Sequence, residues 1–155
     1  MAYAETTSVS PEKSKAEIEG MLRKAGAKKF MQFWDDEQAV IQFMLNDRMV
    51  RFVLPMPDRK DHRFHYTAQN KRRTAKAAEQ QYEQGIRQKW RALLLVIKAK
   101  LEAIDSGIVT FDEEFMAHIV LPDNKTMGEV FVPQIAQSYE DGGNPPMLPN
   151  YSAGS

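Results

Sequence analysis

The residues whose chemistry stands out in this chain lie between positions 58 and 76, where basic side chains are interleaved with aromatic rings. Cations bind phosphate groups, and an aromatic ring gives a nucleic-acid base a stacking face worth ~1–3 kcal/mol. On a flexible loop this combination is typical of proteins that bind single strands or junctions. The predicted nucleic-acid-binding residues are Arg59, Lys60, Arg63, Phe64, Tyr66, Lys71, Arg72, Arg73 and Lys76, with His62 and His65 as further candidates for stacking or backbone contact.

The charge of the chain is unevenly distributed, although its 21 basic and 21 acidic residues sum to zero. Residues 1–50 carry a net charge of −1, residues 51–100 carry +9, and residues 101–155 carry −8. A basic segment of this density needs an anionic partner, which is either a nucleic acid or the protein's own acidic C-terminal third. The first alternative predicts an open basic surface, and the second predicts one that is covered by acidic helices.

The histidines are the candidates for a metal site. His62 and His65 lie three residues apart, and Glu114 and His118 lie four apart on a predicted helix. Histidine and carboxylate groups can bind a divalent ion, yet the sequence has no HExxH motif, no Gly-rich phosphate loop and no cysteine nucleophile. We therefore predict no catalytic residue, no metal and no cofactor, with a metal-dependent nuclease as the remaining enzymatic alternative.

The composition indicates one domain with an ordinary core. The 155 residues are 43% hydrophobic, and the absence of cysteine excludes disulfides and thiol-ligated zinc. The longest apolar run, residues 92–97, is far too short to cross a bilayer, and the first 15 residues lack the pattern of a signal peptide. We therefore expect a cytoplasmic protein with no membrane partner.

The N-terminal third of the sequence predicts a helix followed by three strands. Ser10 and Pro11 are typical of a helix start, and Gly26 is a natural helix end. Residues 29–34 read as a short strand, and a turn at residues 46–47 joins two longer ones. The two-residue turn sets a register that pairs apolar side chains on one face, namely Phe43 with Val50, Ile41 with Phe52 and Ala39 with Leu54.

The remainder of the sequence predicts a loop and then helices. Residues 58–70 have no hydrophobic period and indicate a loop, whereas residues 71–104 have apolar residues at helical spacing. Gly85 is the expected break in this long helix. Capping boxes at Thr110 and Thr126 predict two shorter helices, over residues 111–120 and from 127 onward, and Pro133 is expected to kink or restart the second.

These elements define an α+β fold, because the helices follow the strands as a run instead of alternating with them. We expect an N-terminal helix and a small antiparallel sheet, made of a β-hairpin plus one strand, to pack on the long central helix. Two shorter helices follow. Residues 10–140 form this single domain, residues 1–9 are expected to be flexible, and residues 141–155 form a Gly/Pro-rich tail.

One resemblance adds a biological context. The stretch RFVLPMPDR, continued by QKWRALLLVIKAKLEAIDSGIVTFDEEFMAHIVLPDNKTMGE, resembles a family of small uncharacterised proteins of tailed phages and prophages. The similarity runs from about residue 10 to residue 139. It implies a small cytoplasmic protein made during phage growth, of the kind that serves DNA replication or recombination or blocks a host defence, and it transfers no site residue.

The sequence therefore predicts a non-enzymatic nucleic-acid-binding accessory protein of phage DNA metabolism, with single-stranded DNA as the favoured ligand. RNA and double strands stay open as alternatives. The competing hypothesis is a protein-binding inhibitor or adaptor, for example an anti-defence protein that contacts a host or phage protein through its acidic C-terminal third. We also expect homo-oligomers in which the basic half-helix before Gly85 meets the acidic third of another copy.

Overall fold

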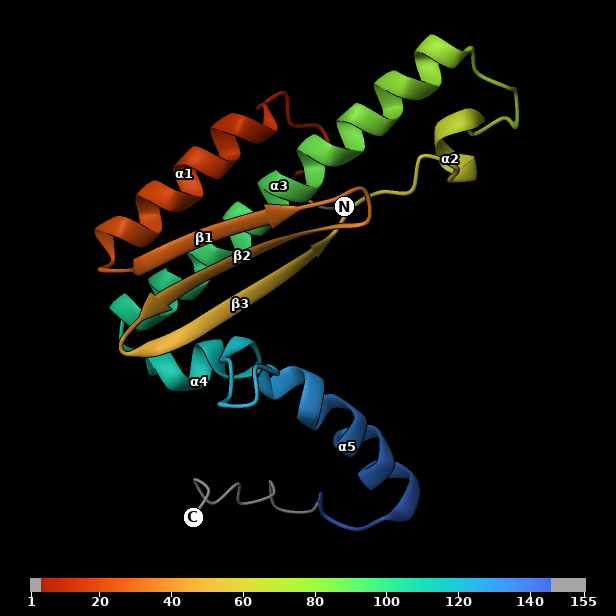
Figure 1. Ribbon diagram of the computed structural model, residues 1–155. Helices are drawn as coiled ribbons and strands as arrows, with labels where there is room; N and C mark the ends of the chain where they lie inside the picture. The colour runs from red at the N-terminus through yellow and green to blue at the C-terminus, as the bar shows by residue number, and fades with distance from the viewer. Residues whose placement is uncertain (1–3, 146–155) are drawn as a thin grey trace.

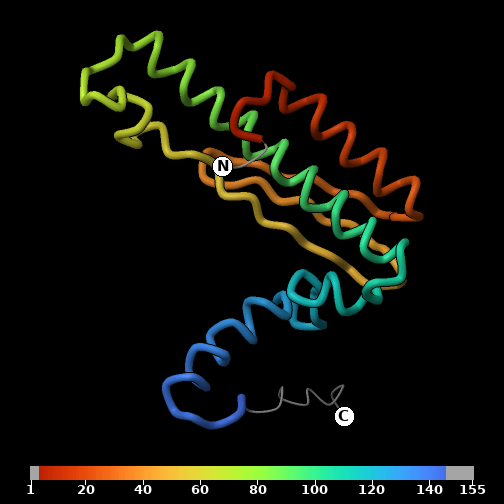
Figure 2. Tube along the Cα trace, turned by 180° about the vertical axis from the view of Figure 1, so that it is seen from behind, coloured from red at the N-terminus to blue at the C-terminus, as the bar shows by residue number. Residues whose placement is uncertain are grey.

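Residues 4–145 are described by the computed structural model, and they form an α+β fold, as predicted. The three antiparallel strands make one sheet in the order β1-β2-β3. Helices α1 and α3 cover one face of this sheet, and the other face has no helical layer (Figures 1 and 2). The elements are α1 (Pro11–Lys24), β1 (Lys28–Trp34), β2 (Gln38–Leu45), β3 (Arg48–Pro55), α2 (His62–His65), α3 (Ala75–Asp105), α4 (Phe111–Phe115), the 3-10 helix η1 (Met116–His118) and α5 (Met127–Asp141).

The core lies between the inner face of the sheet and helices α1 and α3, and α4 adds Phe111 and Phe115 to it. The predicted hairpin register is confirmed, since Phe43 pairs with Val50 and Ile41 with Phe52. Asn46 and Asp47 both have positive φ, at 52° and 58°, which is the backbone of a type I′ turn. The largest side chains that are almost completely buried are Trp90, Phe43, Phe115, Ile18, Leu22, Ile41, Ile97 and Val50.

Helix α1 begins and ends where the sequence predicts. The Ser10 hydroxyl accepts a hydrogen bond from the Lys13 N–H, which satisfies one donor of the first turn. Gly26 has a φ of +99°, a backbone conformation that favours glycine, and it turns the chain from α1 into β1. Ile18 and Leu22 of this helix are buried in the core against the sheet.

Helix α3 is continuous over 31 residues, so the predicted break at Gly85 is wrong. It also begins at Ala75 instead of Lys71, because the Thr74 side chain caps it by accepting from the Ala77 N–H. Gly85 is buried, and a Cβ added there would lie 3.2 Å from Pro57 Cγ and 3.3 Å from Phe64 Cζ. The glycine therefore allows another segment to approach the helix closely.

The helix predicted over residues 111–120 is shorter than expected. The capping box of Thr110 and Glu113 is present, but α4 gives way to η1 and the helix then ends. The reason is the open edge of β3, to which Val120 donates a hydrogen bond at the Met49 carbonyl oxygen over 2.8 Å. Helix α5 follows without a restart at Pro133 and ends at Gly142, whose φ is +73°.

The described part of the predicted flexible N-terminus contacts the fold. Ala4 is 3% exposed, and the Gln84 side-chain amide donates to the Thr7 carbonyl oxygen over 2.8 Å. Residues 1–3 of that segment and residues 146–155 of the predicted tail lie outside the described residues. Within residues 4–145, every helix is too short or too polar to serve as a membrane span.

Candidate nucleic-acid interface

The predicted binding residues gather at one end of the molecule, where the chain leaves β3 and folds back along the N-terminal half of α3 (Figure 1). We call residues 59–76 the basic tip. The predicted loop over residues 58–70 is partly wrong, because residues 62–65 form the short helix α2. Its N-cap is Asp61, whose carboxylate accepts from the Arg63 N–H over 2.9 Å. The N-cap at Asp61 stabilises this short helix, and the hydrophobic periodicity of the sequence does not predict it.

An aromatic contact attaches α2 to α3. The Phe64 ring meets the Tyr82 ring edge-to-face, with the centroids 6.0 Å apart and the planes at 85°. The same ring also lies over Gly85, where an added Cβ would be 3.3 Å from Phe64 Cζ. Phe64 is half-buried and Tyr82 is 8% exposed. Phe64, which is predicted from the sequence to stack on a base, thus packs on Tyr82 and anchors the basic tip to the helix.

A narrow turn then carries the chain from α2 to the start of α3. Tyr66 and Arg72 form an antiparallel bridge, the Thr67 N–H donates to the Lys71 carbonyl oxygen over 2.8 Å, and the Arg73 N–H donates to the His65 carbonyl oxygen over 2.7 Å. These bonds fix the backbone of residues 65–73. The basic side chains of the turn therefore project from an ordered support.

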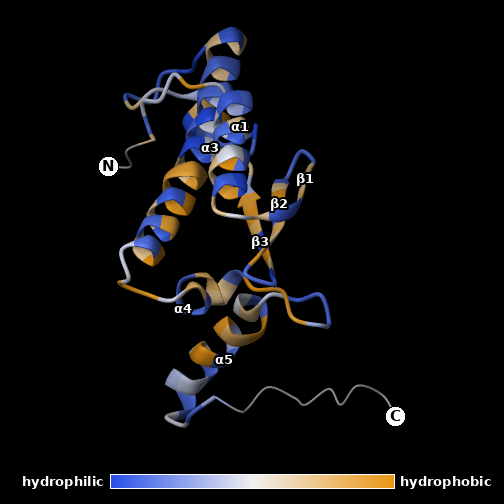
Figure 3. Cartoon of the chain, turned by 90° about the vertical axis from the view of Figure 1, so that its left-hand side faces the viewer, coloured by the Kyte–Doolittle hydropathy of each residue, from blue (hydrophilic) through white to orange (hydrophobic). Residues whose placement is uncertain are grey.

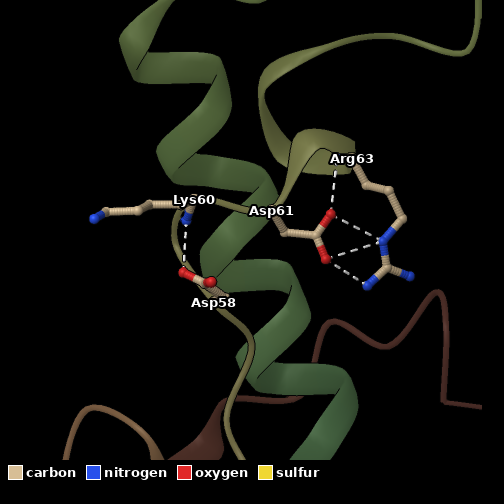
Figure 4. Close-up of polar contacts among 4 residues, drawn as sticks. All are labelled: Asp58, Lys60, Asp61 and Arg63. Atoms are coloured by element: carbon tan, nitrogen blue, oxygen red, sulfur yellow. Dashed lines mark hydrogen bonds and ion pairs between the residues drawn. The ribbon is translucent and has the colours of Figure 1, made fainter.

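Two of the predicted cations have acidic partners nearby. The Arg59 guanidinium lies 2.5 Å from the Glu79 carboxylate and 4.0 Å from the centroid of the Tyr82 ring. Arg63 pairs with Asp61 at 2.8 Å and, by hydrogen bonding to that carboxylate, lowers the pKa of Asp61 to about 2. In Figure 4 the side chains of Lys60 and Arg63 extend to opposite sides of the segment. Residues 59–63 therefore do not present one continuous basic surface.

The turn itself carries the open positive charge. Lys71, Arg72 and Lys76 are exposed, Arg73 is half-buried, and none of them has an acidic partner within 4.0 Å among residues 4–145. They surround the N-terminus of α3, where the helix dipole adds positive potential. Four cations at the start of a 31-residue helix form a surface that attracts anions.

The two histidines of the basic tip take part in local structure. His62 stacks on Tyr66, with centroids 4.2 Å apart and planes at 12°, and the His62 ring is exposed. The His65 Nε2–H donates to the Arg59 carbonyl oxygen over 2.7 Å. In the described part of the chain, no three His, Asp or Glu side chains are grouped to hold a metal ion. A nucleic-acid base could stack on the exposed face of the His62 ring. His65 instead stabilises the backbone through its hydrogen bond to Arg59.

The acidic residues lie at the other end of the molecule. We call residues 111–141, which comprise α4, η1 and α5, the acidic end. Helix α4 packs on the core through Phe111 and Phe115, and α5 projects away from the sheet on the side opposite α2 (Figures 1 and 2). Two ion pairs join it to the fold, Arg48 with Asp112 and Lys100 with Glu114, both at 3.3 Å. Neither cation belongs to the basic tip. Intramolecular neutralisation by the acidic end therefore does not occur at Lys71, Arg72, Arg73 or Lys76.

Two residues that shape the basic tip were not predicted from the sequence. Thr74 caps α3, and its signal was a threonine directly before an alanine-rich helical segment. Glu79 pairs with Arg59 across 20 positions of the chain, a contact that only the fold creates. Tyr82 lies within the helix that the sequence predicts, but its contact with α2 had no sequence signal.

No family model, curated protein or solved structure matches this chain. The resemblance to phage proteins thus stays a prediction. The function has to be inferred from the geometry and charge of the basic tip.

Proposed function

We propose that the protein is a non-enzymatic nucleic-acid-binding accessory protein of phage DNA metabolism, and that its basic tip holds single-stranded DNA. In this proposal Lys71, Arg72 and Lys76 contact phosphates, with support from Arg73 and Lys60. The outer face of His62, stacked on Tyr66, receives a base. Arg59, Arg63 and Phe64 maintain the shape of the site through their contacts with Glu79, Asp61 and Tyr82.

One observation carries this proposal: the cations of the turn have no acidic partner among residues 4–145, while the acidic end lies far from them. Unpaired cations on an ordered turn repel one another, and an anion relieves this repulsion. A phosphate backbone supplies such anions at regular spacing, and binding releases its condensed counterions. A sequence-independent affinity that falls steeply with salt follows from this mechanism.

The test is a fluorescence-polarisation titration of labelled single-stranded DNA at low and moderate salt. The Arg72→Glu, Lys76→Glu double variant removes two exposed cations, so we expect affinity for every oligonucleotide to fall at least about tenfold and the salt slope to decrease by roughly 1.4, at about 0.7 per phosphate contact. The control is Lys13→Glu with Lys98→Glu, which makes the same change in net charge at two exposed sites outside the basic tip.

Equal losses in the two variants would mean that net charge alone drives binding, and the proposed site would be wrong. Absence of binding by the unaltered protein at low salt, to single- and double-stranded oligonucleotides alike, would remove nucleic acid as the ligand. The protein-binding inhibitor or adaptor would then be the better hypothesis.

A second variant separates stacking from charge. His62→Ala removes the exposed ring of the stacked pair and leaves every cation of the turn in place. If His62 receives a base, single-strand affinity falls by up to the ~1–3 kcal/mol typical of one stacked base, and the salt slope stays unchanged. An unchanged affinity would reduce the proposal to phosphate contacts only.

A further inference from the structure

The outer face of the sheet is mostly apolar, and no helix among residues 4–145 covers it. We define the outer sheet face as Met31, Phe33, Val40, Met44, Met49 and Val53, which share one side by strand register with the hydrogen-bonded pair Gln42 and Arg51. Of these, Phe33 is 57% exposed, Val53 is 49% and Met31 is 38%. In Figure 1 this face is turned to the viewer, with α1 and α3 behind the sheet. A patch of this kind marks an interaction surface.

Helix α5 is the second surface of this kind, because its apolar side chains are not buried in the core. Among its 15 residues none is buried, and Val132 is 61% exposed, Ile135 48% and Tyr139 88%. Their spacing of three and four residues places them on one stripe of the helix. Figure 3 shows α5 standing clear of the body with hydrophobic segments along it. A groove of about 340 Å³ between α5 and η1 extends this apolar surface, lined by Met116, Phe131, Val132 and Ile135.

The two surfaces match in length and in charge. A 15-residue helix is about 22 Å long, and an eight-residue strand is about 26 Å long. On the helical wheel, Glu129 and Glu140 lie along one flank of the α5 stripe, and α5 contains no Lys or Arg. Lys28, which is exposed and pairs with Met44, lies beside the outer sheet face. The acidic helix and the sheet with its adjacent lysine are therefore complementary.

Contacts at the root of α5 direct it away from its own sheet. Arg51 donates to the Asn124 carbonyl oxygen over 2.8 Å, and the Val120 N–H donates to Met49 of β3, so the segment before α5 is attached to the β3 edge. At Gly128 a Cβ would lie 2.9 Å from the Ala117 carbonyl oxygen, so the first turn of α5 sits directly on η1. Folding back onto the outer sheet face would break these contacts. A second copy can reach that face without breaking them.

We propose that α5 of one copy docks on the outer sheet face of a second copy, so that the chain forms a reciprocal dimer. This interface goes beyond the proposed function, because it leaves the basic tip of both copies open. The dimer also replaces the predicted contact between the basic half-helix and the acidic third with a contact that buries apolar surface.

Variants on the two halves of the interface should have the same effect. We expect sedimentation velocity to show a concentration-dependent dimer, and Ile135→Glu in α5 and Val53→Glu in β3 each to raise its dissociation constant at least tenfold. Ile108→Glu is the matched control, since Ile108 is apolar and 77% exposed but lies on neither surface. A monomer at every concentration would overturn the proposal. So would a defect with Ile135→Glu alone, because α5 would then contact something other than the sheet.

Cross-linking distinguishes docking of α5 on a second copy from docking of α5 on its own sheet. The chain has no native cysteine, so only the introduced cysteines can form a disulfide. A mixture of an Ile135→Cys copy and a Val53→Cys copy of different tag length should give a disulfide-linked heterodimer under mild oxidation. Ile108→Cys mixed with Val53→Cys should not. A double Ile135→Cys, Val53→Cys variant that oxidises within a monomer, with no link between copies, would show that α5 covers its own sheet and would overturn the dimer.

Discussion

The basic tip and the acidic end are built in opposite ways. The basic tip has few apolar residues, yet it is held by an aromatic pair, a capped short helix and a bonded turn, all attached to α3. The acidic end has more apolar residues and regular helical caps, and α4 buries Phe111 and Phe115 in the core, yet no residue of α5 is buried. The basic tip is therefore held by polar and aromatic contacts along α3, whereas α5 leaves its apolar side chains exposed.

This difference indicates where each region gains its stability. The basic tip rests on the central helix, whose C-terminal half supplies Trp90 and Ile97 to the core, so its order is coupled to global folding. Helix α5 touches the fold mainly through η1, and an isolated helix of this length is marginal in water. The proposed binding surface on the basic tip is thus pre-formed, whereas the exposed apolar side chains of α5 would be packed only in the proposed dimer.

The largest expected difference is in hydrogen exchange. In dilute protein, where the proposed dimer dissociates, amides of residues 134–141 in α5 should open at least ~3 kcal/mol more easily than those of residues 86–97 in α3. Exchange followed by mass spectrometry at the peptide level measures both segments in one experiment. Equal protection in dilute protein would mean that α5 is stable by itself, and the comparison between the two ends would fail.

A substitution at the base of the tip should reveal its coupling to the core. Phe64→Ala removes a half-buried ring that packs on Tyr82 and Gly85, so the free energy of unfolding should fall by about 2 kcal/mol. Ile135→Ala in α5 removes a 48% exposed side chain and should change it by less than about 0.5 kcal/mol. Urea denaturation of the two variants gives both values. A neutral Phe64→Ala would return Phe64 to the stacking role that the sequence predicts.

The sequence predicted the sheet better than the tip because the two depend on different information. Alternation over eight residues and a two-residue turn determine the register of Phe43 with Val50, and both are local patterns. The contact between Phe64 and Tyr82 links a polar segment to a helix 18 positions away, and no local period encodes it. Gly85 was read by its propensity as a break, whereas in the fold its lack of a side chain creates a close approach.

The root of the acidic end should respond to pH. His118 stacks on Phe52 with centroids 4.1 Å apart, and burial, together with nearby Lys100, lowers the pKa of His118. The unfolded chain, whose histidine pKa is about 6.5, then binds the proton more readily than the fold does, so stability is complete above that pH and falls below it. Thermal melts at pH 7.5 and 5.5 should show the loss, and His118→Phe, which keeps a ring on Phe52, should reduce it. An unchanged difference in the variant would mean that other groups carry the pH dependence.

The smallest expected effect compares two glycines in helices. Gly20 of α1 is exposed with nothing within 4 Å of an added Cβ, so Gly20→Ala should stabilise the protein by about 0.5–1 kcal/mol. Gly85→Ala gains the same helix propensity, but its methyl would press on Pro57 and Phe64, and the two effects oppose each other. We therefore expect Gly85→Ala to be neutral or destabilising, with weaker binding of single-stranded DNA if the displaced segment moves the turn. Denaturation curves of both variants, measured in parallel, decide the point. If Gly85→Ala stabilises the protein as much as Gly20→Ala does, Pro57 and Phe64 can move away from the added methyl group at no cost. Close packing on α3 would then not hold the basic tip in place.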